Sequence, residues 1–322
     1  MGGIVLGVAA SHSTLMNTHW DKVAGIDRAE RFRHALSEAR DAIAEARPDN
    51  VVIIGSNHFR GFWLDLIPSF TLGVDEVIAA GDGGTPKGPQ KSDPSYAQAL
   101  AEQLVERGTE VAISAKMTID HGQSHAVQYL LRDIDVPVTP LVINVFATPL
   151  PTVKRCVELG GNLARALAQT DRRTVVIASG GLSHQLPWPS RWQDPDGDDE
   201  EFLVEAWRNG RGEWEKYDKR RREIIVGARP TLFPEFDEAF LGRLDKGELG
   251  YYADYTTARI GEEAGNGGQE IRTWLTMASA LGFAPGKTLA YSPMPEWLTG
   301  MGVGVIRPDS EAAGGSGAER GR

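Results

Sequence analysis

Short runs of apolar, mostly β-branched residues alternate with amphipathic stretches along most of the chain. Residues 4–8 and 51–55 are apolar or glycine throughout, and residues 174–178 are apolar after Thr174, which is typical of parallel strands buried on both faces. Residues 26–46 carry apolar side chains at helical spacing with charged residues between them, and this pattern predicts an amphipathic helix. The alternation predicts an α/β fold whose central sheet is largely parallel or mixed and is flanked by helices.

The same pattern predicts further elements: strands at 110–113, 136–144 and 302–306, and helices at 96–107, 150–168 and 271–281. Residues 188–265 are more charged and richer in Trp and Tyr. We expect them to form helical excursions that cover a site or contact another subunit. Residues 1–309 are expected to form a single catalytic domain, and the Gly/Ser/Ala/Glu-rich residues 310–322 a disordered tail.

Composition excludes several classes of protein. The 322 residues are 41% hydrophobic and 24% charged, with a net charge of −10. A pI of about 5.3 argues against broad binding to nucleic acid or to an anionic membrane. The single cysteine, Cys156, cannot form an internal disulfide, which favours a reduced, cytoplasmic protein. The apolar runs are too short to span a bilayer, and the N-terminus does not resemble a signal peptide.

Histidines follow three of the expected strands. His12, His58 and His184 each lie in a short loop after an apolar run, and His121 follows the region at 111–119. The carboxyl ends of parallel strands share one edge of a sheet, where α/β proteins place their sites. His125 lies four residues after His121, and either a supporting role in the site or a purely structural one fits it.

Such a cluster would offer nitrogen and oxygen donors only. Two histidines and one carboxylate suit Fe(II) with open positions, although a zinc hydrolase would use similar ligands. The HExxH spacing of zincins is absent. Glu270 is the candidate carboxylate because it follows a Gly-rich loop and begins the helix at 271–281, where it could instead interact with the helix dipole. The glycines at 81–88 follow no expected strand, which argues against a phosphate-binding loop.

Several longer motifs are spread over residues 3–306. They are Ser11-His12-Ser13, Asn57-His58 with Gly61-Phe62, Asp120-His121-Gly122, Val142-Ile143-Asn144 with Ala147-Thr148-Pro149-Leu150-Pro151, Ser179-Gly180-Gly181-Leu182-Ser183-His184-Gln185, Glu270-Ile271 with Thr273-Trp274, and Pro295-Glu296-Trp297. Together they resemble the class III (LigB-type) extradiol ring-cleavage dioxygenases, and most closely the branch that acts on 2,3-dihydroxyphenylpropionate. The chain departs from the usual pattern at Thr14, Asn57 and Gln269, where related chains often carry Pro, Asp and His.

The resemblance implies a function and a set of roles. It implies that His12, His58 and Glu270 hold Fe(II), and that His184 and His121 form an acid–base pair. The substrates would be a small aromatic diol and O₂, and the product a ring-opened semialdehyde or keto acid of aromatic catabolism. Neither nucleic acid nor membrane is an expected partner. We further expect a cytoplasmic homo-oligomer.

Three alternatives remain open from the sequence. The ring could be that of protocatechuate, a gallate derivative or 2-aminophenol. The same histidines could serve a zinc-dependent hydrolase. The chain could also be a non-enzymatic, Memo-like binding protein, although all five expected site positions are filled, which favours an enzyme.

Overall fold

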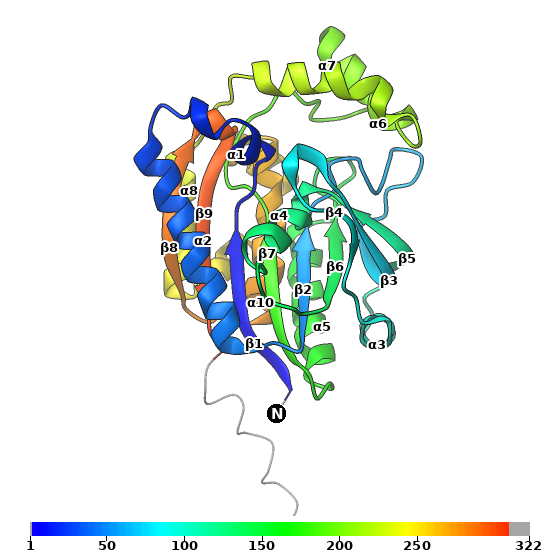
Figure 1. Cartoon of the computed structure of the whole chain (residues 1–322), viewed down its shortest axis with the longest axis vertical. Helices are drawn as coiled ribbons and strands as arrows, with labels where there is room; N and C mark the ends of the chain where they lie inside the picture. Colours follow the sequence, from blue (N-terminus) through cyan, green and yellow to red (C-terminus); the bar gives the residue numbers. More distant parts are fainter. Residues whose placement is uncertain (1, 309–322) are drawn as a thin grey trace, which may run out of the picture.

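Within residues 2–308, which the computed structural model describes, a mixed sheet of nine strands has helices packed on both faces (Figure 1). The strands are β1 (Gly3–Ala10), β2 (Asn50–Gly55), β3 (Phe70–Ala80), β4 (Lys87–Gln90), β5 (Ala112–Ile119), β6 (Val138–Ile143), β7 (Arg173–Ser179), β8 (Gly286–Met294) and β9 (Thr299–Ile306). The α-helices are α1 (Thr14–Thr18), α2 (Ile26–Ala46), α3 (Pro94–Glu106), α4 (His121–Tyr129), α5 (Val153–Leu167), α6 (Gly197–Asn209), α7 (Trp214–Gly227), α8 (Pro234–Lys246), α9 (Thr257–Ala264) and α10 (Ile271–Ala280).

The centre of the sheet is parallel and its flanks are mixed. The strand order is β4-β3-β6-β2-β7-β1-β9-β8, with β5 beside β3. Strands β6, β2, β7 and β1 pair in parallel, whereas β3 is antiparallel to β6 and β9 is antiparallel to β1. The expected α/β fold with a largely parallel or mixed sheet is confirmed.

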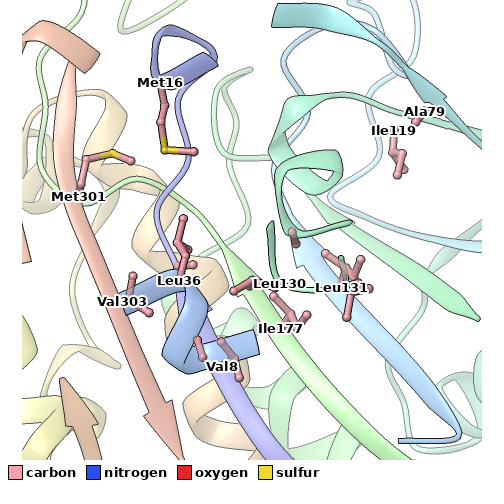
Figure 2. Close-up of a cluster of buried hydrophobic side chains, with 14 of the residues drawn as sticks. Val8, Met16, Leu36, Ala79, Ile119, Leu130, Leu131, Ile177, Met301 and Val303 are labelled. Carbon is pink, nitrogen blue, oxygen red and sulfur yellow. The ribbon is translucent and has the colours of Figure 1, made fainter. Parts of the chain in front are cut away.

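Neighbouring residues of the central strands supply two separate cores. Side chains alternate between the two faces of a strand, so Ile53 and Ile177 join the cluster under α2, and Val52 and Val176 join the cluster under α5 and α10. Figure 2 shows part of the first cluster, where Leu36 of α2 lies near side chains of the central strands. These continuous apolar strands were predictable because both of their faces are buried.

Three strands were missed and one was misplaced. The apolar pattern did not predict β3, β4 or β8, and the strand expected at 110–113 begins at Ala112 and ends at Ile119. Strand β5 is partly exposed and alternates polar with apolar side chains, as strands with one face in solvent do. Strand β8 lies at the edge of the sheet, where its proline is tolerated.

The expected helical excursion divides into two parts. Helices α6 and α7 lie above the end of the sheet where β2 and β6 terminate (Figure 1). Helix α8 instead packs against β8 and β9, and α9 packs against a 3₁₀ turn at Gly267–Glu270. No helix among the described residues is long and apolar enough to cross a membrane. The tail expected at 310–322 lies outside the described residues.

Candidate metal centre

Three adjacent strands bring three histidines to one place. His12, His58 and His184 follow β1, β2 and β7, which are neighbours in the order β2-β7-β1. His121 begins α4, which packs against β2 and β7. All four side chains are buried. The ring centroids of His58 and His121 are 3.9 Å apart, and those of His12 and His58 are 5.2 Å apart.

Glu270 joins this group from the segment between α9 and α10. It ends the 3₁₀ turn at 267–270 and is the N-cap residue of α10. Its Oε1 atom lies 3.3 Å from His12 Nε2 and 3.7 Å from His58 Nε2. The carboxylate accepts hydrogen bonds from Ser56 Oγ at 2.5 Å and from Gly181 N at 2.6 Å. The side chains predicted from the sequence as a site therefore converge.

Each histidine is oriented through its Nδ1 atom. His12 Nδ1 lies 2.9 Å from Ser179 Oγ, and His58 Nδ1 lies 3.1 Å from Asp120 Oδ1. Because a carboxylate only accepts, we assign the proton of His58 to Nδ1. Nε2 is then left unprotonated and able to bind a metal.

His121 is held in the same way as His58. Its Nδ1 atom lies 2.5 Å from Asp82 Oδ2, and its backbone N–H donates to the other oxygen of Asp82 at 3.0 Å. Asp82 lies two residues after the end of β3, in the glycine-rich segment at residues 81–88. The sequence-based view that these glycines follow no strand was therefore wrong, because β3 was missed.

The donor atoms present fit a divalent metal ion. His12 Nε2 is buried and has no hydrogen-bond partner among the described residues. Glu270 is 2% exposed, and within residues 2–308 its ion-pair partners are imidazoles rather than Lys or Arg. A buried carboxylate requires a compensating cation. An ion bound between Glu270, His12 and His58 would supply that charge and use the free nitrogen.

A second set of donors shares two of these residues. Ligand atoms of His12, His58 and His121 all lie within 4.8 Å of one another. The geometry therefore offers either two imidazoles with a carboxylate or three imidazoles. The three-imidazole set would leave the charge of buried Glu270 without a direct counter-ion.

Electrostatics keep Glu270 ionised and act differently on the surrounding imidazoles: burial opposes a charge on His12, but Glu270 outweighs it and raises the pKa of His12. Burial raises the pKa of Glu270 on its own, but His12, His58 and His184 outweigh it and bring that pKa well below its usual range. Burial lowers the pKa of His184 and, together with His58, that of His121. A metal ion binds the deprotonated nitrogen of an imidazole, so an ion bound beside Glu270 would replace the proton that this carboxylate favours on His12.

A small cavity lies against these side chains. It has a volume of about 80 Å³. Its further lining residues are mainly apolar and include Leu15, Phe146, Leu186, Trp188, Ile225, Trp297 and Leu298, with Arg221 of α7. Phe146 and Trp188 pack edge to face with ring centroids 4.7 Å apart, and the Phe146 centroid is 5.0 Å from that of His58. The cavity therefore combines polar donors on one side with aromatic walls suited to a flat ring.

Comparison with known proteins decides the family. A family model described as the catalytic LigB subunit of aromatic ring-opening dioxygenase matches residues 7–302. The chain belongs to this family. Proteins named 2,3-dihydroxyphenylpropionate/2,3-dihydroxicinnamic acid 1,2-dioxygenase are similar to the chain over nearly their whole length. Those of Rhodococcus jostii and Photorhabdus laumondii subsp. laumondii are each 34% identical to it. The first match covers 91% of this chain and 95% of the relative, and the second covers 94% and 96%.

The protein is thus a class III extradiol dioxygenase, an oxidoreductase that cleaves a catechol ring. Its relatives favour this activity over the hydrolase and the binding protein considered from the sequence. The fold places all five of the residues implied by the resemblance around one cavity: His12, His58, His121, His184 and Glu270.

Sequence reasoning missed the residues that support this dioxygenase site. Ser56, Ser179 and Asp82 contact the site residues directly, but the sequence assigned none of them a role, because a single Ser or Asp carries no distinguishing pattern even where it lies in a longer motif, as Ser179 does. Arg221 was also missed, because it lies within a charged helix whose faces the sequence cannot tell apart.

His125 lies behind the cluster and does not line the cavity. Its ring is 6.2 Å from that of His12 and stacks on Tyr129 at 5.6 Å, measured between centroids. Burial and the nearby His12 lower the pKa of His125 to about 3, and its Nε2 atom has no hydrogen-bond partner in the described chain. A neutral, tightly packed ring behind His12 favours the structural role for His125.

Proposed function

We propose that the dioxygenase uses Fe(II), held by His12, His58 and Glu270, to open the ring of a substituted catechol with O₂. The observation that carries this proposal is the position of the Glu270 carboxylate, within 3.7 Å of the Nε2 atoms of both histidines. Two imidazoles and a carboxylate leave coordination positions open for the diol and O₂. When bound there, Fe(II) would hold both reactants together and mediate electron transfer between them.

The names of the relatives indicate the substrate class. They act on 2,3-dihydroxyphenylpropionate and 2,3-dihydroxycinnamic acid by name. We propose a catechol with a short acidic side chain for this enzyme too, with a ring-opened keto acid as product. The aromatic walls formed by Phe146, Trp188 and Trp297 would stack against the ring.

His184 is the proposed base for the substrate hydroxyl. Its Nδ1 atom lies 2.9 Å from the carbonyl oxygen of Leu182 and 3.0 Å from Thr299 Oγ1. A carbonyl only accepts, so Nδ1 carries the proton and Nε2 can take one from the substrate. Burial lowers the pKa of His184, which keeps it in the neutral form that a base requires.

His121 is the proposed partner that stores and returns a proton. Asp82 holds its Nδ1 atom and would stabilise the ring if Nε2 became protonated. Burial and the nearby His58 lower the pKa of His121, so it is neutral in the resting protein and, once protonated, would readily return the proton.

Metal content and turnover test these roles separately. After anaerobic loading with Fe(II), H12A and E270A should lose both iron and activity. H184Q should keep its iron and lose about 10²- to 10⁴-fold in turnover. Iron would be measured by elemental analysis, and turnover by O₂ uptake and the absorbance of the yellow product with substituted catechols.

Two outcomes would contradict the proposal. H184Q with wild-type turnover would remove His184 from the chemistry. Loss of iron in H121A, with iron retained in E270A, would assign the metal to the three-imidazole set instead.

A further inference from the structure

Helix α7 presents one cation to the cavity. Arg220, Arg221 and Arg222 follow one another, and successive residues of a helix point about 100° apart. Arg221 lines the cavity together with Ile225, which lies one turn later on the same face. Arg220 and Arg222 point elsewhere and pair with Asp199 and Asp218.

Arg221 has no anionic partner of its own within residues 2–308. None of the ion pairs or side-chain hydrogen bonds in that range includes its guanidinium, which contacts the ring of Trp214 at 4.9 Å. Arg221 is partly buried, and this burial lowers its pKa. An anion that enters the cavity would therefore stabilise the charge of Arg221.

The acidic residues around Arg221 are already engaged. Asp82 contacts His121, and Asp120 contacts His58. Asp218 is shared by Arg60, at 3.5 Å, and Arg222, at 3.2 Å. The negative charges of these three carboxylates act on Arg221 from a distance and partly raise its pKa. No carboxylate oxygen of the described chain lies within 4.0 Å of its guanidinium.

A second guanidinium increases the positive charge beside Arg221. The guanidinium of Arg60 lies 3.4 Å from the ring centroid of Trp214, on which Arg221 also packs. Burial and the nearby Arg221 lower the pKa of Arg60 to about 9. An anion bound to Arg221 would offset this repulsion.

We propose that Arg221 is the specificity-determining residue that binds the side-chain carboxylate of the catechol. The inference rests on the proposed function, because the two hydroxyls of the catechol would bind at the metal site formed by His12, His58 and Glu270. An arginine can bind a carboxylate through two parallel hydrogen bonds, which fixes orientation as well as charge. The aromatic walls would hold the ring between these two ends.

A larger cavity nearby is a weaker candidate for the acidic side chain. It has a volume of about 520 Å³ and shares Phe146 and Trp188 with the site, so these two rings separate it from the histidines. Its cation, Arg191, is exposed and belongs to the outer surface. A carboxylate there would gain less from pairing, because water already solvates that charge.

The test compares two ligands that differ in one carboxylate. Binding of 2,3-dihydroxyphenylpropionate and of uncharged 3-propylcatechol to Fe(II)-loaded protein is measured by calorimetry without O₂, so that no turnover is needed. R221Q should weaken binding of the acid about 10- to 100-fold. It should change binding of 3-propylcatechol less than about threefold. R221K should recover part of the loss, and the neighbouring R220Q should bind both ligands like wild type.

The outcomes separate the two proposals. The role of Arg221 is overturned if R221Q weakens both ligands equally or neither, or if wild type does not prefer the acid. Admitting O₂ then tests the proposed function alone. If wild type binds the acid through Arg221 but opens no ring, the carboxylate site stands and the catalytic proposal fails.

Discussion

The position of a single glycine shows how closely the protein surrounds its candidate base. A Cβ atom at Gly267 would lie 1.9 Å from His184 Nε2, the atom that we propose accepts the substrate proton. The ring cannot move away easily, because Leu182 and Thr299 hold its other nitrogen. Glycine at this position therefore leaves room for the working face of His184.

We predict that G267A loses turnover while remaining folded. The added methyl group should displace the imidazole and reduce kcat by about 10²-fold or more. G242A in α8 is the matched control, since its Cβ would meet no atom within 4 Å. The control should keep full activity and gain up to about 1 kcal/mol in unfolding free energy. Steady-state O₂ uptake measures kcat, and circular dichroism shows whether each variant is folded and follows its unfolding. Normal turnover in G267A would contradict this placement of His184.

Prediction of individual site residues succeeded for the histidines at the strand ends. Histidines after strands are few, so His12, His58 and His184 stood out against the rest of the sequence. Asp82 and Arg221 did not, because acidic and basic residues occur throughout the chain and only their contacts distinguish them. Whether a charged side chain meets solvent or a buried ring depends on packing that the sequence pattern does not encode.

At the level of elements, the support for Glu270 comes from the packing of α5 against α10. These two helices meet at Gly160, where a Cβ would lie 2.2 Å from the carbonyl oxygen of Thr276 and 2.8 Å from Ser279 Cβ. Both atoms belong to α10, which begins immediately after Glu270. The close approach of the two helices thus fixes the element that carries the carboxylate.

We predict opposite effects for two adjacent glycines of α5. G160A should lower the unfolding free energy by about 1–3 kcal/mol, because backbone atoms of α10 must move to admit the methyl group. G161A should raise it by about 0.4–1 kcal/mol, because the nearest atom is the flexible guanidinium of Arg165 at 3.6 Å. Urea denaturation measures both, and equal effects would show that α5 and α10 do not pack as described.

Element prediction was most accurate for the interior of the fold. The long helix expected at 26–46 matches α2, and the apolar runs match β1, β2 and β7, because burial on both faces leaves a continuous hydrophobic signal. Strands β3 and β8 lack that signal, since each has partly exposed or polar positions. The loop that carries Asp82 was misjudged for the same reason.

At the level of the whole molecule, Asp237 joins three distant elements. It lies on α8, is fully buried, and accepts hydrogen bonds from Ser183 N at 2.8 Å, Ser183 Oγ at 2.9 Å and Tyr291 Oη at 2.8 Å. It thereby connects the loop of His184 to β8. Burial raises the pKa of Asp237 to about 6, above its ordinary value.

This raised pKa predicts how stability depends on pH. The folded protein binds the Asp237 proton more tightly than the unfolded chain does, so the contribution is fully present below about pH 4 and is lost as pH rises through about 6. A change from 3.8 to about 6 corresponds to at most about 3 kcal/mol. The unfolding free energy of wild type relative to D237N should therefore fall between pH 4 and 7. Urea denaturation over that range checks this, and parallel curves would refute it.

The sequence by itself determined the alternation of buried strands and helices, the histidines at the strand ends and the family resemblance. Each depends on local signals, namely hydrophobic period, strand-end position and motif. Tertiary structure alone gave the distances from Glu270 to His12 and His58. It alone decided that Asp82 and Asp120 orient two imidazoles and that Arg221 turns toward the cavity. These contacts join residues far apart in the chain, and their distances depend on how the strands pair and the helices pack.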